Sequence, residues 1–168
     1  MARIAILVTS DKGAAGQRID LSGQAIADRC RAAGHDVLAH EVVPDERGLI
    51  AGKLASWADA GLADLIVTTG GTGLTPRDVT PEATRDVGER DVPGIPIALA
   101  LAGLAKTPYA ALTRGVAVTR AGTLIVNLPG SPKAVEEGMD VLLPLIPHIA
   151  ELLAGPHEHA PGAGRPQP

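Results

Sequence analysis

A glycine-rich loop between residues 68 and 83 carries the residue types best suited to chemistry. It reads Thr-Thr-Gly-Gly-Thr-Gly-Leu-Thr-Pro-Arg-Asp-Val-Thr-Pro-Glu-Ala. Gly70, Gly71 and Gly73 leave the main chain bare, so its N–H groups can approach a ligand closely, and Thr72 adds a hydroxyl. This combination favours a site for a phosphorylated ligand. A tight strand-to-helix connection that needs positive φ angles would explain the glycines equally well.

Two acidic residues, Asp78 and Asp45, are the candidate catalytic and metal-binding side chains. Asp78 lies five residues after Gly73, and Asp45 follows a predicted strand. Because one or two carboxylates usually hold Mg²⁺ beside a nucleotide, we expect both acids to bind Mg²⁺ and to position the substrate. An Asx turn or a capping role would also explain Asp78, and a plain surface turn would explain Asp45.

Polar residues next to two other predicted strands complete the candidate substrate site. Ser10 and Asp11 follow the first strand. Pro129, Gly130 and Ser131 precede the last predicted helix, where free N–H groups and the helix dipole favour an anion. Simple helix capping is the alternative explanation for both groups.

Three basic residues and one acid near the loop are further candidates. Arg77, Arg114 and Lys133 are possible counter-charges for phosphate, although single basic residues are more often just solvated. Glu82 lies in the first turn of a predicted helix, where an acid stabilises the helix dipole. We expect Arg77 and Glu82 to contact the substrate.

Several familiar site types are disfavoured. No Gly-Lys-Ser/Thr follows the glycines, and the loop is not Gly-x-Gly-x-x-Gly, which argues against a kinase-like P-loop and an ordinary dinucleotide fold. The sequence has no Ser/His/Asp elbow, and its histidines lack metal-ligand spacing. The single cysteine, Cys30, fits a buried helical position. Positioning and metal-assisted electrostatics therefore remain as the expected sources of catalysis.

The composition limits the class of protein. The chain has 168 residues and a net charge of −4, with no basic cluster to suit nucleic acid or an anionic membrane. Its start runs straight into a predicted strand without the anatomy of a signal peptide. We therefore expect a cytoplasmic protein that binds neither nucleic acid nor membrane.

Alternating strands and helices predict an α/β fold, a three-layer sandwich with a mostly parallel central sheet. The domain is expected to span residues 1–154, followed by a disordered tail at 155–168 that is rich in Pro, Gly, Ala and His. Ligands of such sheets bind at the carboxyl ends of the strands, and every polar cluster above falls at that edge. The predicted strands cover residues 3–9, 36–43, 63–69, 115–119 and 123–127. The predicted helices cover residues 22–33, 47–60, 95–104 and 132–153, together with a segment that begins with Thr80 as its N-cap. The last helix is expected to be kinked at Pro144 and Pro147.

The same motifs resemble those of the molybdopterin adenylyltransferases, the MogA/MoaB type of molybdenum cofactor biosynthesis protein. The likeness rests mainly on Thr-Thr-Gly-Gly-Thr-Gly-x-x-x-Arg-Asp-x-Thr-Pro-Glu-Ala at 68–83. Three supporting motifs occur in the right order: Ser-Asp with Asp-x-Ser-Gly at 10–23, Pro-Asp-Glu at 44–46, and Asn-Leu-Pro-Gly-Ser-Pro-Lys-Ala at 127–134. The resemblance covers residues 3–153.

This resemblance implies a magnesium-dependent transfer of AMP from ATP to the terminal phosphate of molybdopterin, with release of pyrophosphate. It implies a homo-oligomer, commonly a trimer and sometimes a hexamer, and makes the molybdate-insertion enzyme a candidate partner. A carrier or scaffold that binds molybdopterin without turnover is the alternative. A related domain that inserts molybdate or anchors larger proteins fits a chain this short less well.

Overall fold

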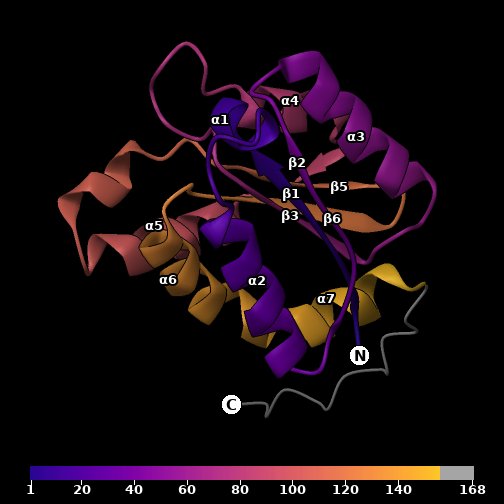
Figure 1. Ribbon diagram of the computed structural model, residues 1–168. Coiled ribbons are helices and arrows are strands. Elements are labelled where there is room, and N and C mark those ends of the chain that lie inside the picture. The colour runs from indigo at the N-terminus through magenta and orange to yellow at the C-terminus, as the bar shows by residue number, and fades with distance from the viewer. Residues whose placement is uncertain (156–168) are drawn as a thin grey trace.

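The centre of the fold is a six-stranded sheet in the order β2-β1-β3-β6-β5-β4 (Figure 1). The computed structural model describes residues 1–155. β2, β1, β3 and β6 are parallel, whereas β5 is antiparallel to β6 and β4 is antiparallel to β5. The predicted α/β fold with a mostly parallel sheet is therefore confirmed. The strands are β1 (Arg3–Thr9), β2 (Asp36–Val43), β3 (Leu65–Thr69), β4 (Arg90–Asp91), β5 (Ala117–Arg120) and β6 (Thr123–Leu128).

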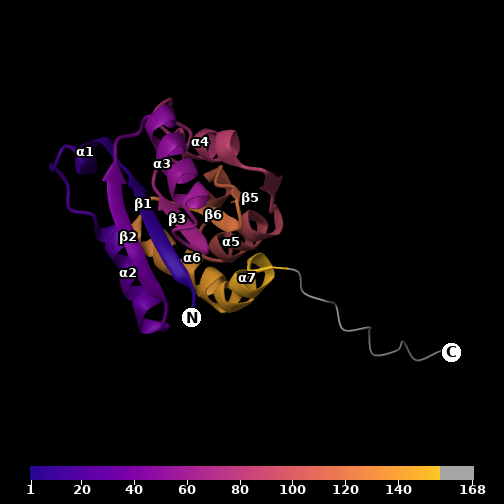
Figure 2. The same cartoon turned by 90° about the vertical axis from the view of Figure 1, so that its right-hand side faces the viewer.

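Helices cover both faces of the sheet and make three layers (Figure 2). Alternate side chains of a strand point to opposite faces, so Ile4 and Ile6 join one apolar cluster while Ala5 and Leu7 join the other. All four are fully buried, as expected for a strand covered on both sides. The first cluster is covered by α2 (Leu21–Ala32), α5 (Gly94–Leu104), α6 (Pro132–Leu142) and α7 (Ile146–Leu153), and the second by α3 (Arg47–Asp59) and α4 (Thr80–Val87).

The start of α4 differs from the prediction. Val79, not Thr80, occupies the N-cap position, and no side chain caps the helix. The Thr80 hydroxyl instead lies 3.0 Å from Thr9 Oγ1, and the Thr80 N–H donates to Gly71 O at 3.1 Å. The prediction of Thr80 as N-cap is wrong, because its hydroxyl is buried in a polar contact under the glycine loop.

The remaining boundaries shift by a few residues. β3 begins at Leu65, and the carboxylate of Asp64 just before it accepts hydrogen bonds from the Arg3 N–H and from Arg3 Nη2. The last helix is interrupted by a 3₁₀ turn at Leu143–Leu145, as expected at Pro144, which has no N–H to donate. Three short elements left no periodic pattern and were missed: α1 (Asp11–Ala14), the 3₁₀ helix η1 (Pro108–Leu112) and β4.

Two further points concern membrane-spanning helices and the C-terminal tail. Within residues 1–155, no helix combines the length and the apolar character needed to cross a lipid bilayer. The predicted tail lies, after Gly155, outside the described residues.

Candidate active site

Three loops meet where the parallel strands β1, β3 and β6 end. The Thr69 hydroxyl donates to Pro129 O at 2.7 Å, which ties the glycine loop after β3 to the segment after β6. The Ser22 hydroxyl, in the first turn of α2, donates to Gly130 O at 2.8 Å. The sheet topology thus brings residues far apart in sequence to one edge, as the rule for parallel sheets predicts.

The tight connection after β3 requires two glycines of the loop. Gly70 and Gly71 have φ angles of 96° and 61°, a region that other residues rarely adopt. A Cβ at Gly71 would lie 2.3 Å from Thr80 Oγ1, and one at Gly70 would lie 2.3 Å from Thr9 O. The tight connection therefore demands glycine, and the same bare backbone lines a cavity.

Asp45 is held at the edge of the sheet by Asp11 and Arg77. The Asp11 N–H donates to Asp45 Oδ2 at 2.9 Å, and the Asp45 N–H donates to Asp11 Oδ1 at 3.0 Å. Arg77 completes the set with Nε and Nη2 bonds to the Asp11 carboxylate at 3.0 and 2.7 Å. Asp11 and Arg77 thus position Asp45 and do not line the cavity themselves.

The pKa values of the two acids in this cluster move in opposite directions. Burial, with the neighbouring charges of Asp11 and Asp78, raises the pKa of Asp45, although the Asp11 amide opposes the change. The hydrogen bonds from Arg77 and from the Asp45 amide lower the pKa of Asp11. Asp45 is therefore the acid whose negative charge is least well compensated, which suits a group that meets a cation or a cationic complex.

Asp78 holds the loop in shape as well as facing the site. Its carboxylate accepts hydrogen bonds from Thr75 N at 2.8 Å and from Thr75 Oγ1 at 2.6 Å. Burial by itself would raise the pKa of Asp78, but the bonds from Thr75 and from the Gly73 amide hold that pKa below its ordinary value. These bonds come from residues that precede Asp78, and no side chain caps α4, so they are neither an Asx turn nor a helix cap; they fix the carboxylate in the wall of the site.

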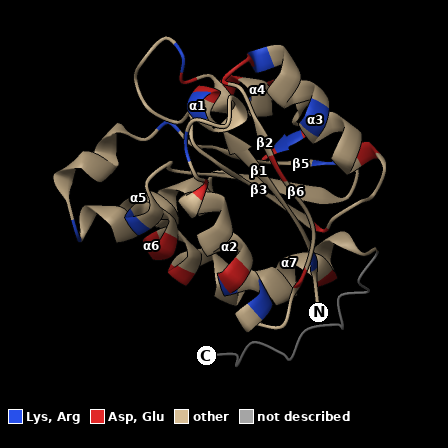
Figure 3. Ribbon diagram, viewed as in Figure 1, with Lys and Arg blue, Asp and Glu red and all other residues tan. Residues whose placement is uncertain are grey.

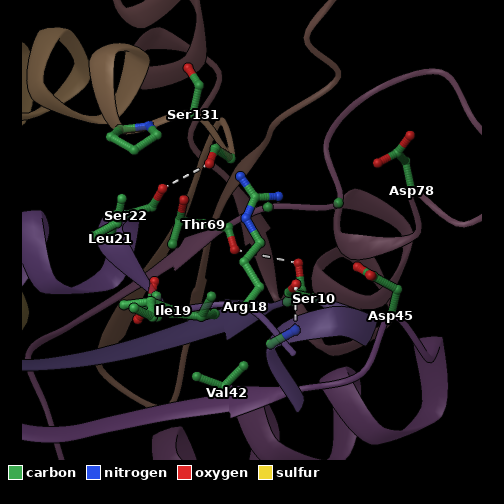
Figure 4. Close-up of a pocket in the computed structure, with 18 residues that line it drawn as sticks. Ser10, Arg18, Ile19, Leu21, Ser22, Val42, Asp45, Thr69, Asp78 and Ser131 are labelled. Atoms are coloured by element: carbon green, nitrogen blue, oxygen red, sulfur yellow. Dashed lines mark hydrogen bonds between the residues drawn. The ribbon is translucent and has the colours of Figure 1, made fainter. Parts of the chain in front are cut away.

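Two cavities share this wall. The first, of about 400 Å³, is about half polar and is lined by Arg18, Asp20 and Asp45 among others; we call it the polar cavity. Figure 4 shows Arg18 reaching across it, with Asp45 and Asp78 on one side and Ser22 and Ser131 on the other. The second, of about 460 Å³, is mainly apolar and lies under α5 and η1. Both are lined by Gly71, Asp78, Gly130 and Ser131.

The structure places most of the predicted site residues around these cavities. Ser10, Asp45 and Gly70 line the polar cavity alone, and Thr72, Gly73 and Pro129 line the apolar cavity alone. Asp11, Arg77 and Glu82 line neither cavity. The Glu82 carboxylate is instead paired with Arg114.

Other lining residues were missed by sequence reasoning. Asp20 caps α2 by accepting from Gly23 N at 2.7 Å, and it contacts His40 Nε2 at 2.6 Å. The Asp-x-Ser-Gly spacing was the available signal. Asp20 caps the helix three residues ahead of Gly23, and the close contact requires glycine there, because a Cβ at Gly23 would lie 2.2 Å from Asp20 Oδ2. In the apolar cavity, Leu99 and Ala100 had no such signal, since their segment is plain aliphatic.

Asp45 and Asp78 alone cannot complete the coordination shell of a divalent cation. No group of three or more His, Cys, Asp or Glu side chains within residues 1–155 could enclose a metal ion. Asp45 and Asp78 face the same cavity, and their charges repel each other. Two hard carboxylates fit Mg²⁺, which usually takes one or two protein acids and completes its shell with water and substrate phosphate.

Comparison with known proteins identifies the family. A family model described as "Probable molybdopterin binding domain" matches residues 5–148. The chain belongs to this family. It is 40% identical over 154 residues to the molybdopterin adenylyltransferase of Helicobacter pylori, covering 90% of this chain and 88% of the relative. The resemblance to MogA and MoaB is thereby confirmed.

One further relative is much longer than this chain, and one solved structure of similar length has the same fold. The chain is 46% identical over 112 residues to the Drosophila melanogaster molybdenum cofactor synthesis protein cinnamon, of which it spans only 19%. The crystal structure of the molybdopterin biosynthesis enzyme MoaB from Thermus thermophilus is 50% identical, with a TM-score of 0.86 over 93% of this chain and 98% of that one.

Proposed function

We propose that this protein is a molybdopterin adenylyltransferase, which transfers AMP from ATP to molybdopterin and releases pyrophosphate. The observation that carries the proposal is the pair of cavities with a common wall. A transfer between two bound substrates needs two adjacent sites whose reacting groups meet, and holding them together removes much of the entropic barrier. The family and its curated relatives of similar length support the same reaction.

The chemistry takes place at the shared wall. A terminal phosphate oxygen of molybdopterin attacks the α-phosphorus of ATP, forming a new P–O bond. The bond from the α-phosphorus to the bridging oxygen breaks, and its electron pair leaves with pyrophosphate. No side chain in the wall needs to form a covalent intermediate, so the protein contributes positioning and electrostatic stabilisation.

The residues of the shared wall and of the polar cavity have separate tasks. The bare backbone at Gly70 and Gly71 and the N-terminal turn of α6 at Ser131 face phosphate oxygens. Asp45 and Asp78 would hold Mg²⁺, which neutralises charge on the phosphates when bound. Arg18 adds one positive charge inside the polar cavity.

The decisive test is pyrophosphate release by the purified protein. We expect ATP to yield pyrophosphate and adenylated molybdopterin only when molybdopterin and Mg²⁺ are both present. If molybdopterin binds but no pyrophosphate is formed with an active relative assayed in parallel, the protein is a carrier or scaffold and the proposal is overturned.

We also propose that the protein is a homo-oligomer, a trimer by resemblance, that α5 helps to assemble. Helix α5 is apolar on all sides, yet Ile95 is its one buried side chain, and Ile97 and Leu101 are 58% and 63% exposed. Residues 94–113 contain a single charged side chain, Lys106, and Figure 3 shows this arm almost free of charge colouring. Such a surface favours contact with another protein chain.

Two measurements test this assembly. Light scattering should give about three times the mass of 17.1 kDa, and Leu101→Glu should lower it. A monomeric wild type would contradict the proposal.

The use of ATP favours a cytoplasmic location, and the product would pass to the enzyme that inserts molybdate.

A further inference from the structure

Arg114, just before β5, is bound to the glycine loop at three separate points. Its main-chain N–H donates to Thr72 O at 2.9 Å. Its Nε donates to Gly73 O at 2.7 Å, and its Nη2 donates to Asp78 O at 2.6 Å. One residue from a distant part of the chain thus fixes both ends of the 72–78 segment.

Glu82 holds the Arg114 guanidinium in this position. The guanidinium pairs with the Glu82 carboxylate through Nη1 and, at 3.4 Å, through Nη2. The hydrogen bond from Arg114 lowers the pKa of Glu82, so the acid stays charged. Since Nε, Nη1 and Nη2 all donate within the protein, Arg114 is not placed to act as a counter-charge for substrate phosphate, and Arg114 lines neither cavity.

The bonds to Arg114 also set the direction of the peptide groups in the loop. In a trans peptide the C=O and the following N–H point in opposite directions. With Thr72 O turned toward Arg114, the Gly73 N–H must point away from it, and that amide is one of the groups that stabilise the Asp78 carboxylate. The Asp78 carbonyl is itself held by Arg114. Both the backbone and the side chain of Asp78 therefore depend on this contact.

We propose that Arg114, held by Glu82, is a positioning residue that sets the glycine loop and Asp78 in their active arrangement. The inference rests on the proposed adenylyl transfer for its kinetic consequence. Its structural part, that the pair restrains residues 72–78, holds for the free protein without any substrate.

A matched ion pair elsewhere in the chain provides the control. Arg120 makes bonds of 2.8 Å with both oxygens of Asp59 and donates to Val87 O at 3.0 Å. This pair has the same chemistry as Arg114 with Glu82, also beside a main-chain carbonyl, but it touches no residue of either cavity wall. Arg120→Gln therefore reports the cost of losing such a pair without disturbing the loop.

The test compares Arg114→Gln, Glu82→Gln, the double variant and Arg120→Gln. We expect each loop variant to lower kcat about 10²-fold, as for a small misplacement of a catalytic group, with KM for ATP changed less than about twofold. The double variant should be no worse than either single one, because the pair acts as a unit. Amide hydrogen exchange across residues 72–79 of the free protein should accelerate in both loop variants and not in Arg120→Gln.

Different results would overturn the inference in distinguishable ways. A raised KM for ATP in Arg114→Gln, with normal kinetics in Glu82→Gln, would make Arg114 a substrate ligand. An equal loss of kcat in Arg120→Gln would reduce the effect to general stability. If the wild type itself shows no adenylyl transfer, the proposed function fails, and unchanged amide exchange in the loop variants would then refute the positioning role independently.

Discussion

The two cavities on either side of the glycine loop differ in polarity. The polar cavity is bounded by the ends of β1 and β3 and contains Arg18, Asp20 and Asp45. The apolar cavity is roofed by α5 and η1 with Leu99, Tyr109 and Leu112. Under the proposed function, the polar cavity would recognise its ligand by charge and hydrogen bonds, and the apolar cavity would recognise its ligand by shape. Their common wall consists of Gly71, Asp78, Gly130 and Ser131, which would contact both substrates of the proposed reaction.

The difference follows from how each cavity is built. The polar cavity lies at the carboxyl edge of the parallel strands, where loops and the N-terminus of α2 bring polar groups together. The apolar cavity is formed by an excursion of the chain, residues 94–113, that packs beside the sheet and carries one charged residue. In the proposed reaction, the edge of the sheet would supply the reacting groups, and the excursion would supply a second binding surface.

Asp78→Asn should have the largest effect, because this carboxylate faces both cavities. We expect AMP transfer to fall by about 10²- to 10³-fold, the usual scale for removing one electrostatic contact in a transition state. The remaining oxygen of asparagine still accepts a bond from Thr75, so molybdopterin binding should change little. Radiolabelled AMP transfer and equilibrium binding of molybdopterin measure the two effects. An equal loss of both would refute the catalytic role of Asp78.

Gly71→Ala should damage both cavities together. Its φ of 61° is unfavourable for alanine, and the new Cβ would lie 2.3 Å from Thr80 Oγ1. We expect a loss of about 1–3 kcal/mol in the free energy of unfolding and a fall of about 10²-fold in activity. Denaturant unfolding and the transfer assay measure these.

Gly34→Ala is the matched control for that variant. Gly34 has a φ of 81°, and a Cβ there would meet nothing within 4 Å. This variant should show the strain cost without the loss of activity. If Gly34→Ala is as inactive as Gly71→Ala, close approach at the shared wall is not the reason for the glycine.

Asp45→Asn should lower activity but not stability. Because burial raises the pKa of Asp45, the folded protein is stabilised when this group is protonated, and that contribution is lost as the pH rises through its raised pKa. Asparagine carries no charge, so the Tm of the variant should exceed that of the wild type increasingly as the pH rises above the ordinary aspartate value of 3.8. Thermal unfolding from pH 4 to pH 8 measures this difference.

Asp11→Asn gives the opposite sign as a control. Arg77 lowers the pKa of Asp11, so the charged form stabilises the fold, and this contribution is lost as the pH falls through that lowered pKa. The variant should have a slightly lower Tm than the wild type at neutral pH. A Tm for Asp45→Asn that lies below the wild type at pH 7 would show that the Asp45 charge is not a source of strain.

Much of this arrangement was predictable, and the failures have physical causes. Continuous apolar runs such as Ile4 to Val8 predicted buried parallel strands, and strand ends then placed Ser10, Asp45 and the glycine loop at one edge. Thr80 was wrongly predicted to be an N-cap because threonine before Pro-Glu is typical of one, whereas its hydrogen-bond partner Thr9 lies 71 residues away in the sequence. Arg114 looked like a solvated charge for the same reason: its contacts with the loop are tertiary. The apolar cavity was missed because aliphatic side chains mark a core and a binding site alike.

The central claim is that two substrates occupy separate cavities and react at the wall between them. Binding of a non-hydrolysable ATP analogue and of molybdopterin should be measured separately on Arg18→Glu, which alters only the polar cavity, and on Ala100→Trp, which fills only the apolar one. We expect each variant to weaken the binding of one ligand by about tenfold or more, a loss of about 1.4 kcal/mol, and to leave the binding of the other unchanged. The ligand that is weakened should differ between the two variants. Equal weakening of both ligands by each variant would contradict the account.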